Sequence, residues 1–317
     1  MLPRLTYSLR DIFPLGRRNV ERDIWPYLLL SSVKGLFVAI RDVLVKSLGF
    51  ADVLHGLERL GIEALEVAVD RELGARAFGL SLADPSSLDK LASALEGRGV
   101  TVCAVLLQND FGSENLAKEI EYVRRGVEIA RELGARVVRV DASTRLREGQ
   151  TEDDLLRATV EGLRTALKGT SGVWLAVENH GLVTNRVSFL RRLLDATSGL
   201  SVGLTLDTGN LYWYGYPLSE VYEIYEELSK YVKHTHIKNA RAPPELREAR
   251  RRPGEVTMTP LYEGDIDLRR AVEALASSGY DHDLTIEDES LGRYPPEIRV
   301  RVVARDKEFL ESLIKSA

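Results

Sequence analysis

The chain has 317 residues, of which 44% are hydrophobic and 29% are charged, a composition typical of a globular protein. An intrinsically disordered chain and a collagen-like repeat are therefore excluded. The 43 Lys and Arg residues against 48 Asp and Glu leave a net charge of −5, and no arginine-rich stripe accompanies aromatic residues, so we expect no nucleic-acid partner.

The N-terminal stretch, residues 1–33, is predicted to be an extension that packs against the outside or one end of the main domain, with a partly ordered tail as the alternative. Its apolar segment, residues 25–40, is shorter than the roughly 20 residues that a membrane span needs, and Lys34 interrupts it. We therefore expect no membrane insertion.

Cysteine usage and terminal signals indicate the cellular compartment. The single cysteine, Cys103, allows no internal disulfide, and no signal-peptide pattern is visible, so we expect a cytoplasmic protein. The low count of two methionines and the excess of Arg over Lys are typical of a thermophile.

After the extension, short β-branched apolar runs alternate with amphipathic segments of helical period, as expected for repeated βα units. Eight runs are predicted strands: 36–41, 64–69, 100–107, 137–140, 173–177, 202–206, 232–237 and 282–286. The predicted helices are 50–60, 88–96, 115–133, 152–167, 188–196, 219–231 and 268–277.

Eight such units favour an α/β fold with a single (β/α)8 TIM barrel over a doubly wound sheet, which more often has five or six strands. We assign the barrel to residues 34–317. The Arg-, Glu- and Pro-rich connection 239–264 is predicted to be a long loop without regular structure, and such loops often act as lids.

The active site of such a barrel lies at the carboxyl ends of its strands. Because side chains alternate along a strand, the parity of the apolar residues directs Trp174 and Thr205 into the barrel and Leu175 and Leu204 toward the helices. The same count gives four consecutive strands an inward polar side chain at their ends: Glu178, Asp207, His236 and Glu287.

Together these side chains carry about three negative charges, whose burial without a cation costs many kcal/mol. We therefore predict a site for one divalent metal ion. Three carboxylates and one imidazole suit Mn2+ or Mg2+, with Co2+ or Zn2+ as alternatives. For any single one of these residues, a helix cap or a solvated loop position is the alternative.

The chain also resembles the xylose isomerase-like TIM barrels, a family of sugar isomerases, sugar 3-epimerases, inosose and dehydroshikimate dehydratases, and endonuclease IV. The resemblance spans about residues 36–315. It rests on the motifs Val177-Glu-Asn-His180, Leu206-Asp-Thr-Gly-Asn210, His234-Thr-His-Ile-Lys-Asn239, Glu263-Gly-Asp265, Gly279-Tyr280 and Leu284-Thr-Ile-Glu287.

The resemblance implies that Glu178, Asp207, His236 and Glu287 are metal ligands, and that the two glutamates are also the catalytic acid and base. The implied activity is that of an isomerase or epimerase of a small sugar or sugar-like polyol, acting through an enediolate intermediate. A lyase of the inosose or dehydroshikimate dehydratase type on the same metal site stays open. So does a metal-binding barrel without catalytic activity, although both glutamates are intact.

Six further residues are candidate substrate contacts: His180, Asn210, Lys238, Asn109, Arg139 and Glu66. His180 has the inward parity and would contact substrate, with a loop or helix-cap role as the alternative. Asn210 stands where many relatives carry a histidine and would orient a substrate hydroxyl or form a turn. With only five histidines, the chain also lacks the zinc ligands of endonuclease IV.

The remaining candidates carry alternative interpretations too. Lys238 would pair with an anionic substrate group or with Glu287, or stay solvated. Arg139 shares a strand face with Asp141 and would form a buried ion pair if it does not bind substrate. The expected partner is a small carbohydrate, and a homo-oligomer remains open.

Overall fold

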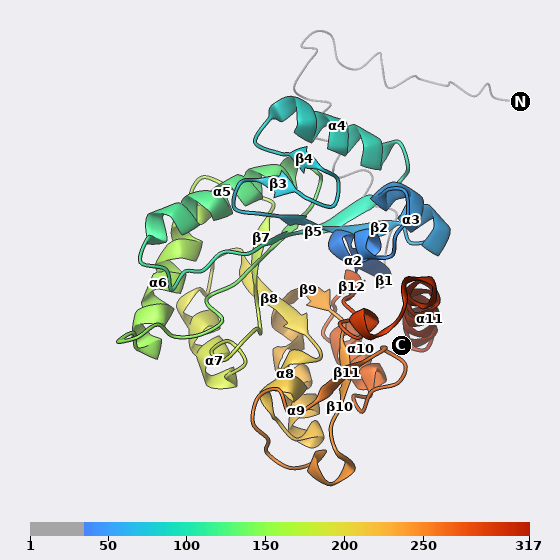
Figure 1. Cartoon of the computed structure of the whole chain (residues 1–317). Helices are drawn as coiled ribbons and strands as arrows, with labels where there is room; N and C mark the ends of the chain where they lie inside the picture. The colour runs from blue at the N-terminus through green and yellow to red at the C-terminus, as the bar shows by residue number, and fades with distance from the viewer. Residues whose placement is uncertain (1–34) are drawn as a thin grey trace, which may run out of the picture. The chain divides into compact units, whose positions relative to one another are not determined.

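Eight parallel strands form the central sheet of the computed structural model, which describes residues 35–317 (Figure 1). They are β1 (Phe37–Arg41), β2 (Ala64–Val69), β5 (Thr101–Leu107), β6 (Val137–Val140), β7 (Trp174–Glu178), β8 (Val202–Asp207), β9 (Val232–His236) and β12 (Asp283–Ile286). The hydrogen-bonded order is β12-β1-β2-β5-β6-β7-β8-β9.

The barrel closes between β9 and β12 through Ile237, just beyond the end of β9. Its backbone N–H donates to the carbonyl oxygen of Thr285 at 2.8 Å, and its carbonyl oxygen accepts from the N–H of Glu287 at 3.1 Å. The predicted TIM barrel is therefore confirmed. The predicted extension, residues 1–33, lies outside the described residues, and its packing stays a prediction.

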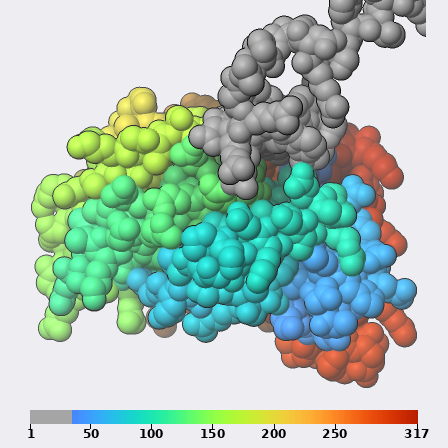
Figure 2. Space-filling view, turned by 90° about the horizontal axis from the view of Figure 1, so that it is seen from above, coloured from blue at the N-terminus to red at the C-terminus, as the bar shows by residue number. Residues whose placement is uncertain are grey.

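The outer layer consists of helices, several of which begin at a capping side chain. They are α2 (Asp42–Ser47), α3 (Val53–Leu60), α4 (Pro85–Glu96), α5 (Leu116–Glu132), α6 (Glu152–Ala166), α7 (Val187–Ala196), α8 (Asn210–Tyr214), α9 (Leu218–Leu228), α10 (Leu268–Ser277) and α11 (Pro296–Ile314). Asp52, Asp84 and Thr151 each accept a hydrogen bond from a backbone N–H of the helix that follows. The C-terminal helix α11 contacts both α3 and α10 and so completes the ring, and Figure 2 shows the red C-terminal segment beside the blue first helices.

Three of these helices were not predicted from the sequence. α2 and α8 have only six and five residues, too few to show a helical period. α11 has an interrupted apolar pattern because its buried face includes Asp306. None of the helices within residues 35–317 is both long and apolar enough to cross a membrane.

Strand alternation divides the barrel wall into two faces. Leu175 and Leu204 belong to the large hydrophobic core between strands and helices, whereas Thr205 is fully buried on the inner face, as predicted. The apolar side chains of the interior are small: Ala39, Ala64, Cys103, Ala104, Val137 and Ala176. Trp174 departs from the prediction, because it is half-buried at the amino-terminal opening, with Lys233 Nζ 4.5 Å from its ring centre.

The predicted structureless loop 239–264 is wrong. It contains an antiparallel hairpin, β10 (Asn239–Arg241) with β11 (Thr257–Thr259), and a short 3-10 turn at Pro244–Leu246. Buried Arg251 donates to the carbonyl oxygens of Tyr212 and Tyr216 at 2.9 and 3.0 Å and stacks 4.0 Å from the Tyr212 ring centre. Arg251 thereby anchors the connection to Tyr212 of α8 and to Tyr216 just after it, and a role as a lid stays a prediction.

Candidate metal centre

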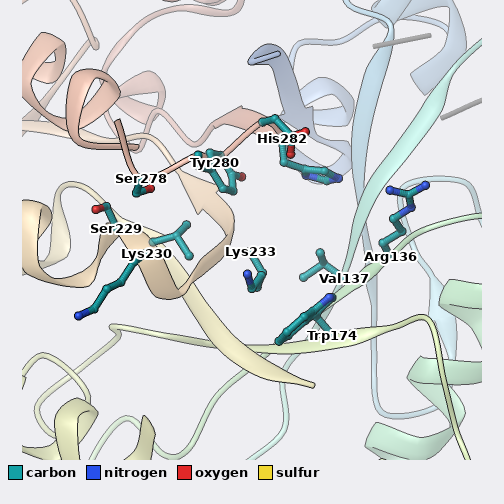
Figure 3. Close-up of a pocket in the computed structure, with 12 residues that line it drawn as sticks. Arg136, Val137, Trp174, Ser229, Lys230, Lys233, Ser278, Tyr280 and His282 are labelled. Carbon is teal, nitrogen blue, oxygen red and sulfur yellow. The ribbon is translucent and has the colours of Figure 1, made fainter. Parts of the chain in front are cut away.

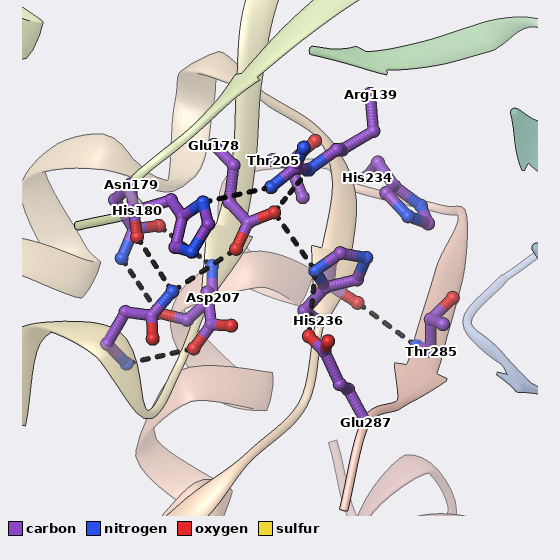
Figure 4. A network of polar contacts seen from close by, with 12 residues as sticks. Arg139, Glu178, Asn179, His180, Thr205, Asp207, His234, His236, Thr285 and Glu287 are labelled. Atoms are coloured by element: carbon purple, nitrogen blue, oxygen red, sulfur yellow. Dashed lines mark hydrogen bonds and ion pairs between the residues drawn. The ribbon is translucent and has the colours of Figure 1, made fainter. Parts of the chain in front are cut away.

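Four polar side chains meet at the carboxyl ends of adjacent strands (Figure 4). Glu178, Asp207 and His236 are the last residues of β7, β8 and β9, and Glu287 directly follows β12. All four are buried, and one ligand atom from each lies within 4.8 Å of the others. The structure thus brings together the four residues that strand alternation selected.

Several atoms of this cluster lack a hydrogen-bond partner. Within residues 35–317, Asp207 Oδ2, His236 Nδ1 and Glu287 Oε2 are buried without one, although the Lys238 ammonium lies beside the two carboxylate oxygens as an ion-pair partner. His236 Nδ1 is 3.2 Å from Glu178 Oε2 and 3.0 Å from Glu287 Oε2. Buried polar atoms are rarely left unpaired, and a divalent cation would satisfy all of these and offset the carboxylate charges. The donor set therefore fits a divalent metal ion.

Glu178 is held by two neighbours from different elements. Arg139, in β6, donates its Nε–H to Glu178 Oε2, and Asn210 donates from Nδ2 to Glu178 Oε1 at 3.2 Å. Burial by itself raises the pKa of Glu178, but the Arg139 guanidinium and then the neighbouring His236 outweigh it and place the pKa well below its usual range. Glu178 is consequently a carboxylate at neutral pH.

Lys238 supplies a positive charge on the other side of the cluster. Its Nζ is 2.9 Å from Asp207 Oδ2, 3.2 Å from Glu287 Oε2 and 2.8 Å from Glu289 Oε1. Burial lowers the pKa of Lys238, but Asp207 and Glu289 more than compensate and raise it. The predicted pairing with Glu287 is present, and the solvated alternative is wrong because Lys238 is only 4% exposed.

The loop between β8 and α8 orients Asp207. Its Oδ1 accepts hydrogen bonds from the backbone N–H groups of Gly209 and Asn210, both at 2.8 Å, which leaves Oδ2 directed at Lys238. Asn179 adds a tie between strands, because its Oδ1 accepts from the N–H of Asp207 at 2.8 Å. Asn210 therefore positions both Asp207 and Glu178, a role that the sequence interpretation did not assign to it.

Two predicted substrate contacts are turned toward the protein. Asn109 donates from Nδ2 to the carbonyl oxygen of Asp141 at 2.8 Å and accepts from its N–H at 3.0 Å, so both amide atoms are used. Arg139 is 4% exposed and bonds to Asp141 Oδ2 at 2.6 Å, which is the buried ion pair of the alternative interpretation.

His180 is the candidate that stays accessible. Its side chain is 40% exposed, and Nδ1 is 2.9 Å from Asp141 Oδ1. Burial lowers the pKa of His180, but Asp141 and Glu178 raise it above its usual value. His180 is therefore held by Asp141 and remains partly exposed at the barrel mouth.

The sequence interpretation missed one residue and misplaced another. Arg41, the last residue of β1, has its Nε 2.9 Å from Glu66 Oε1, and its Nη1 donates to Glu287 Oε1. The signal that could have identified Arg41 is its charged side chain at the end of a predicted strand. Glu66, predicted to contact substrate, is instead fully buried within β2.

A cavity of about 220 Å3 lies at the opposite, amino-terminal end of the barrel (Figure 3). Trp174, Lys233 and His282, from the starts of β7, β9 and β12, contribute to its lining, and none of the four clustered residues does. His282 is half-buried there, with Nδ1 2.7 Å from Asp283 Oδ1. The cavity is therefore separate from the candidate metal centre.

Fold and site together define a TIM barrel whose strand ends present a carboxylate-rich cluster that fits a divalent cation. A family model described as xylose isomerase-like TIM barrel matches residues 55–313. The protein belongs to this family. Among curated proteins, none matches the chain.

Solved structures of the same fold include three informative ones. A mannonate dehydratase from Streptococcus suis serotype 2 superposes with a TM-score of 0.66 at 12% identity, covering 89% of this chain and 94% of that one. An IolI protein with a bound zinc atom gives a TM-score of 0.63 at 16% identity and coverages of 88% and 99%. A D-allulose 3-epimerase from Methylomonas sp., in complex with D-allulose, gives 0.61 at 15% identity and coverages of 88% and 97%. At these identities the likeness establishes the shared fold alone.

Proposed function

We propose that the protein is a divalent-metal-dependent isomerase or epimerase of a small sugar or sugar-like polyol. The observation that carries this proposal is the convergence of Glu178, Asp207, His236 and Glu287, all buried, at one mouth of the barrel. Membership of the xylose isomerase-like family supports it, as does the similarity to an epimerase that binds D-allulose.

The four residues would hold one ion, with Mn2+ or Mg2+ favoured by the carboxylates and Zn2+ or Co2+ as alternatives. Zinc gains support from the similar fold of the IolI protein, which binds a zinc atom. When bound, such an ion supplies Lewis acidity toward a substrate carbonyl. The remaining chemistry belongs to the side chains of the chain itself.

Glu178 is suited to remove the proton from a carbon next to a carbonyl. Its low pKa keeps it ionised, and Arg139 and Asn210 hold its orientation. Glu287 lies on the other side of His236 Nδ1, next to Arg41 and Lys238. A substrate carbon between the two carboxylates would lose a proton to one and regain it from the other, with inversion of configuration.

The test is proton exchange into D2O across a panel of ketoses and inososes with Mn2+ present, followed by NMR or mass spectrometry. The wild type should exchange the α-proton of at least one substrate, and Glu178→Gln should not. Glu223→Gln, a change on the exposed face of α9, is the matched control and should exchange like the wild type. Absence of exchange with every substrate and every candidate metal would contradict the proposal and favour a non-catalytic barrel.

Dehydration is the second candidate, favoured by the fold similarity to a mannonate dehydratase and by the ammonium of Lys238 beside Glu287. A carbanion next to a β-hydroxyl can expel water instead of being reprotonated, with Lys238 as proton donor to the leaving hydroxyl. Product analysis in the same experiment separates the two reactions, because only the lyase releases a product lighter by one water.

A further inference from the structure

A second network of polar side chains fills the barrel interior beside the candidate metal ligands (Figure 4 shows two of its imidazoles). His234 Nδ1 lies 2.9 Å from Asp283 Oδ1, and His234 Nε2 lies 2.7 Å from Glu66 Oε2. His236 Nε2 lies 2.7 Å from that same Glu66 oxygen. The four side chains are at most 1% exposed, so water replaces none of these contacts.

Glu66 is the centre of this network. The imidazoles of His234 and His236 contact its Oε2, and Arg41 lies beside Oε1 at 2.9 Å. A fully buried carboxylate is costly unless such partners surround it. All of these partners are protein groups. Glu66 therefore interacts with other side chains rather than with a substrate.

The geometry determines which nitrogen of His236 carries a proton. The Glu66 carboxylate can only accept, so Nε2 of His236 must donate to it. Nδ1 then faces Glu178 and Glu287, where it has no hydrogen-bond partner within the described residues. An imidazole that binds a metal through one nitrogen commonly donates the other N–H to a carboxylate, which sets its tautomer and orientation.

We propose that Glu66 is a positioning residue for His236, and that His234 and Asp283 hold Glu66 in place. This proposal rests on the metal site of the proposed function. Asp283 is itself fixed, because it accepts from the Thr285 hydroxyl at 2.6 Å and from the Tyr280 hydroxyl at 3.1 Å. The network therefore extends from Asp283, at the start of β12, to His236, the candidate metal ligand at the end of β9.

A second metal site on Glu66, His234 and His236 is the competing interpretation, since their ligand atoms also lie within 4.8 Å of one another. Two observations argue against it. Both imidazoles lie at hydrogen-bonding distance from a single oxygen, and the Arg41 guanidinium already balances the charge of Glu66. The two interpretations predict different numbers of bound ions.

The experiment combines metal binding with histidine NMR on the full chain. Zn2+ affinity and stoichiometry are measured by competition with a chelator, and 15N-histidine spectra of the Zn2+-loaded protein report the tautomer of each of the five histidines. We expect one ion per wild-type chain and a proton on Nε2 of His236. Glu66→Ala should weaken Zn2+ binding by about 10- to 100-fold, the usual effect of removing a group that orients a ligand.

Two further variants separate positioning from general stabilisation. Glu66→Gln keeps one oxygen that can accept from an imidazole, so it should recover part of the lost affinity. Glu63→Ala removes an exposed glutamate just before β2 and should bind Zn2+ like the wild type. A purely structural role of Glu66 would lower the melting temperature without changing the affinity of the folded variant or the tautomer of His236.

Each outcome bears on a different claim. A wild type that takes up no divalent ion overturns the proposed function itself. A wild type with one ion but with a proton on Nδ1 of His236, or a Glu66→Ala variant with unchanged affinity, overturns only the positioning role. Two ions in the wild type, one of them lost in Glu66→Ala, would establish the second metal site instead. If Glu66→Ala does not fold, the tautomer in the wild type and the affinity of Glu66→Gln decide.

Discussion

Two clusters of Asp, Glu and His side chains lie in this barrel, and they differ in how completely their atoms are paired. At the carboxyl ends of the strands, Asp207 Oδ2, His236 Nδ1 and Glu287 Oε2 are buried without hydrogen bonds within residues 35–317. In the interior, both nitrogens of His234 are paired with carboxylates of Glu66 and Asp283, and Glu66 Oε1, which also lacks a hydrogen bond, lies 2.9 Å from Arg41 Nε. The same residue types therefore produce a candidate cation site in one place and a more completely paired network in the other.

The difference shows how burial alone misleads. All of these side chains are at most 7% exposed, so accessibility does not separate function from structure. Ligand atoms that lack hydrogen bonds and converge on a common point do separate them, because natural proteins rarely leave buried polar atoms without hydrogen bonds. The first three predictions below each change one cluster, and the last concerns a residue outside both.

The largest expected effect is loss of the metal ion from the carboxyl-end cluster. His236→Ala and Asp207→Ala should each reduce divalent metal affinity by orders of magnitude, since even groups behind the ligands contribute about 10- to 100-fold. Elemental analysis of the purified proteins measures this against the wild type, for which we expect one ion per chain. Asp195→Ala, on the exposed face of α7, is the control. Equal metal content in all four proteins would remove the distinction between the clusters.

Catalysis should depend equally on the carboxyl-end cluster. Glu178→Gln and Glu287→Gln keep the side-chain volume but cannot take up or release a proton near neutral pH. We expect turnover to fall by about 10²-fold or more with much smaller changes in substrate binding. Steady-state kinetics on any substrate found by D2O exchange provides the measurement. Near-wild-type turnover in both variants would place the chemistry elsewhere in the barrel.

Within the interior cluster, the contacts of His234 should in addition contribute to stability. His234→Gln leaves the carboxylates of Glu66 and Asp283 buried without their shared cationic partner, and breaking a buried pair in this way costs about 3–5 kcal/mol. Denaturant unfolding measures the loss, and His55→Gln, at an exposed position of α3, should leave stability nearly unchanged. A His234→Gln protein as stable as the wild type would show that the interior network is not structural.

A pH dependence of stability should arise away from both clusters, at Asp306 of α11. Burial, and then the neighbouring Asp288, raise the pKa of Asp306 from 3.8 to about 9. The folded state therefore holds a proton that the unfolded chain releases, so this contribution to stability is present at low pH and is lost as the pH rises toward 9. Asp306→Asn keeps the oxygen that accepts from Leu261 N–H at 2.8 Å and imitates the protonated form.

The melting temperature between pH 6 and 9 gives the measurement for Asp306. We expect the wild type to lose more stability over this range than Asp306→Asn does. Parallel curves for the two proteins would mean that Asp306 does not carry the proton.

Strand positions were predictable because each buried strand is a short apolar run, and most predicted boundaries agree with the structure to within a residue or two. Helix α11 was not predicted because buried Asp306 interrupts its apolar face. The partner of Asp306, the backbone N–H of Leu261, is 45 residues away in the chain and is not visible from the local sequence. The hairpin of β10 and β11 escaped because its strands have only three residues each.

The sequence by itself determined the barrel and which residues face its mouth, because alternation along a strand is a local rule that can be applied to each apolar run. Glu178, Asp207, His236 and Glu287 followed from it. Tertiary structure alone decided the partners of the charged side chains, such as Arg41 with Glu287, which are 246 residues apart in the chain. The register shift between Leu65 and Glu66 in β2 is likewise a feature that only the tertiary structure decides. Strand register decides which long side chains meet, and a shift of one residue exchanges the two faces of a strand.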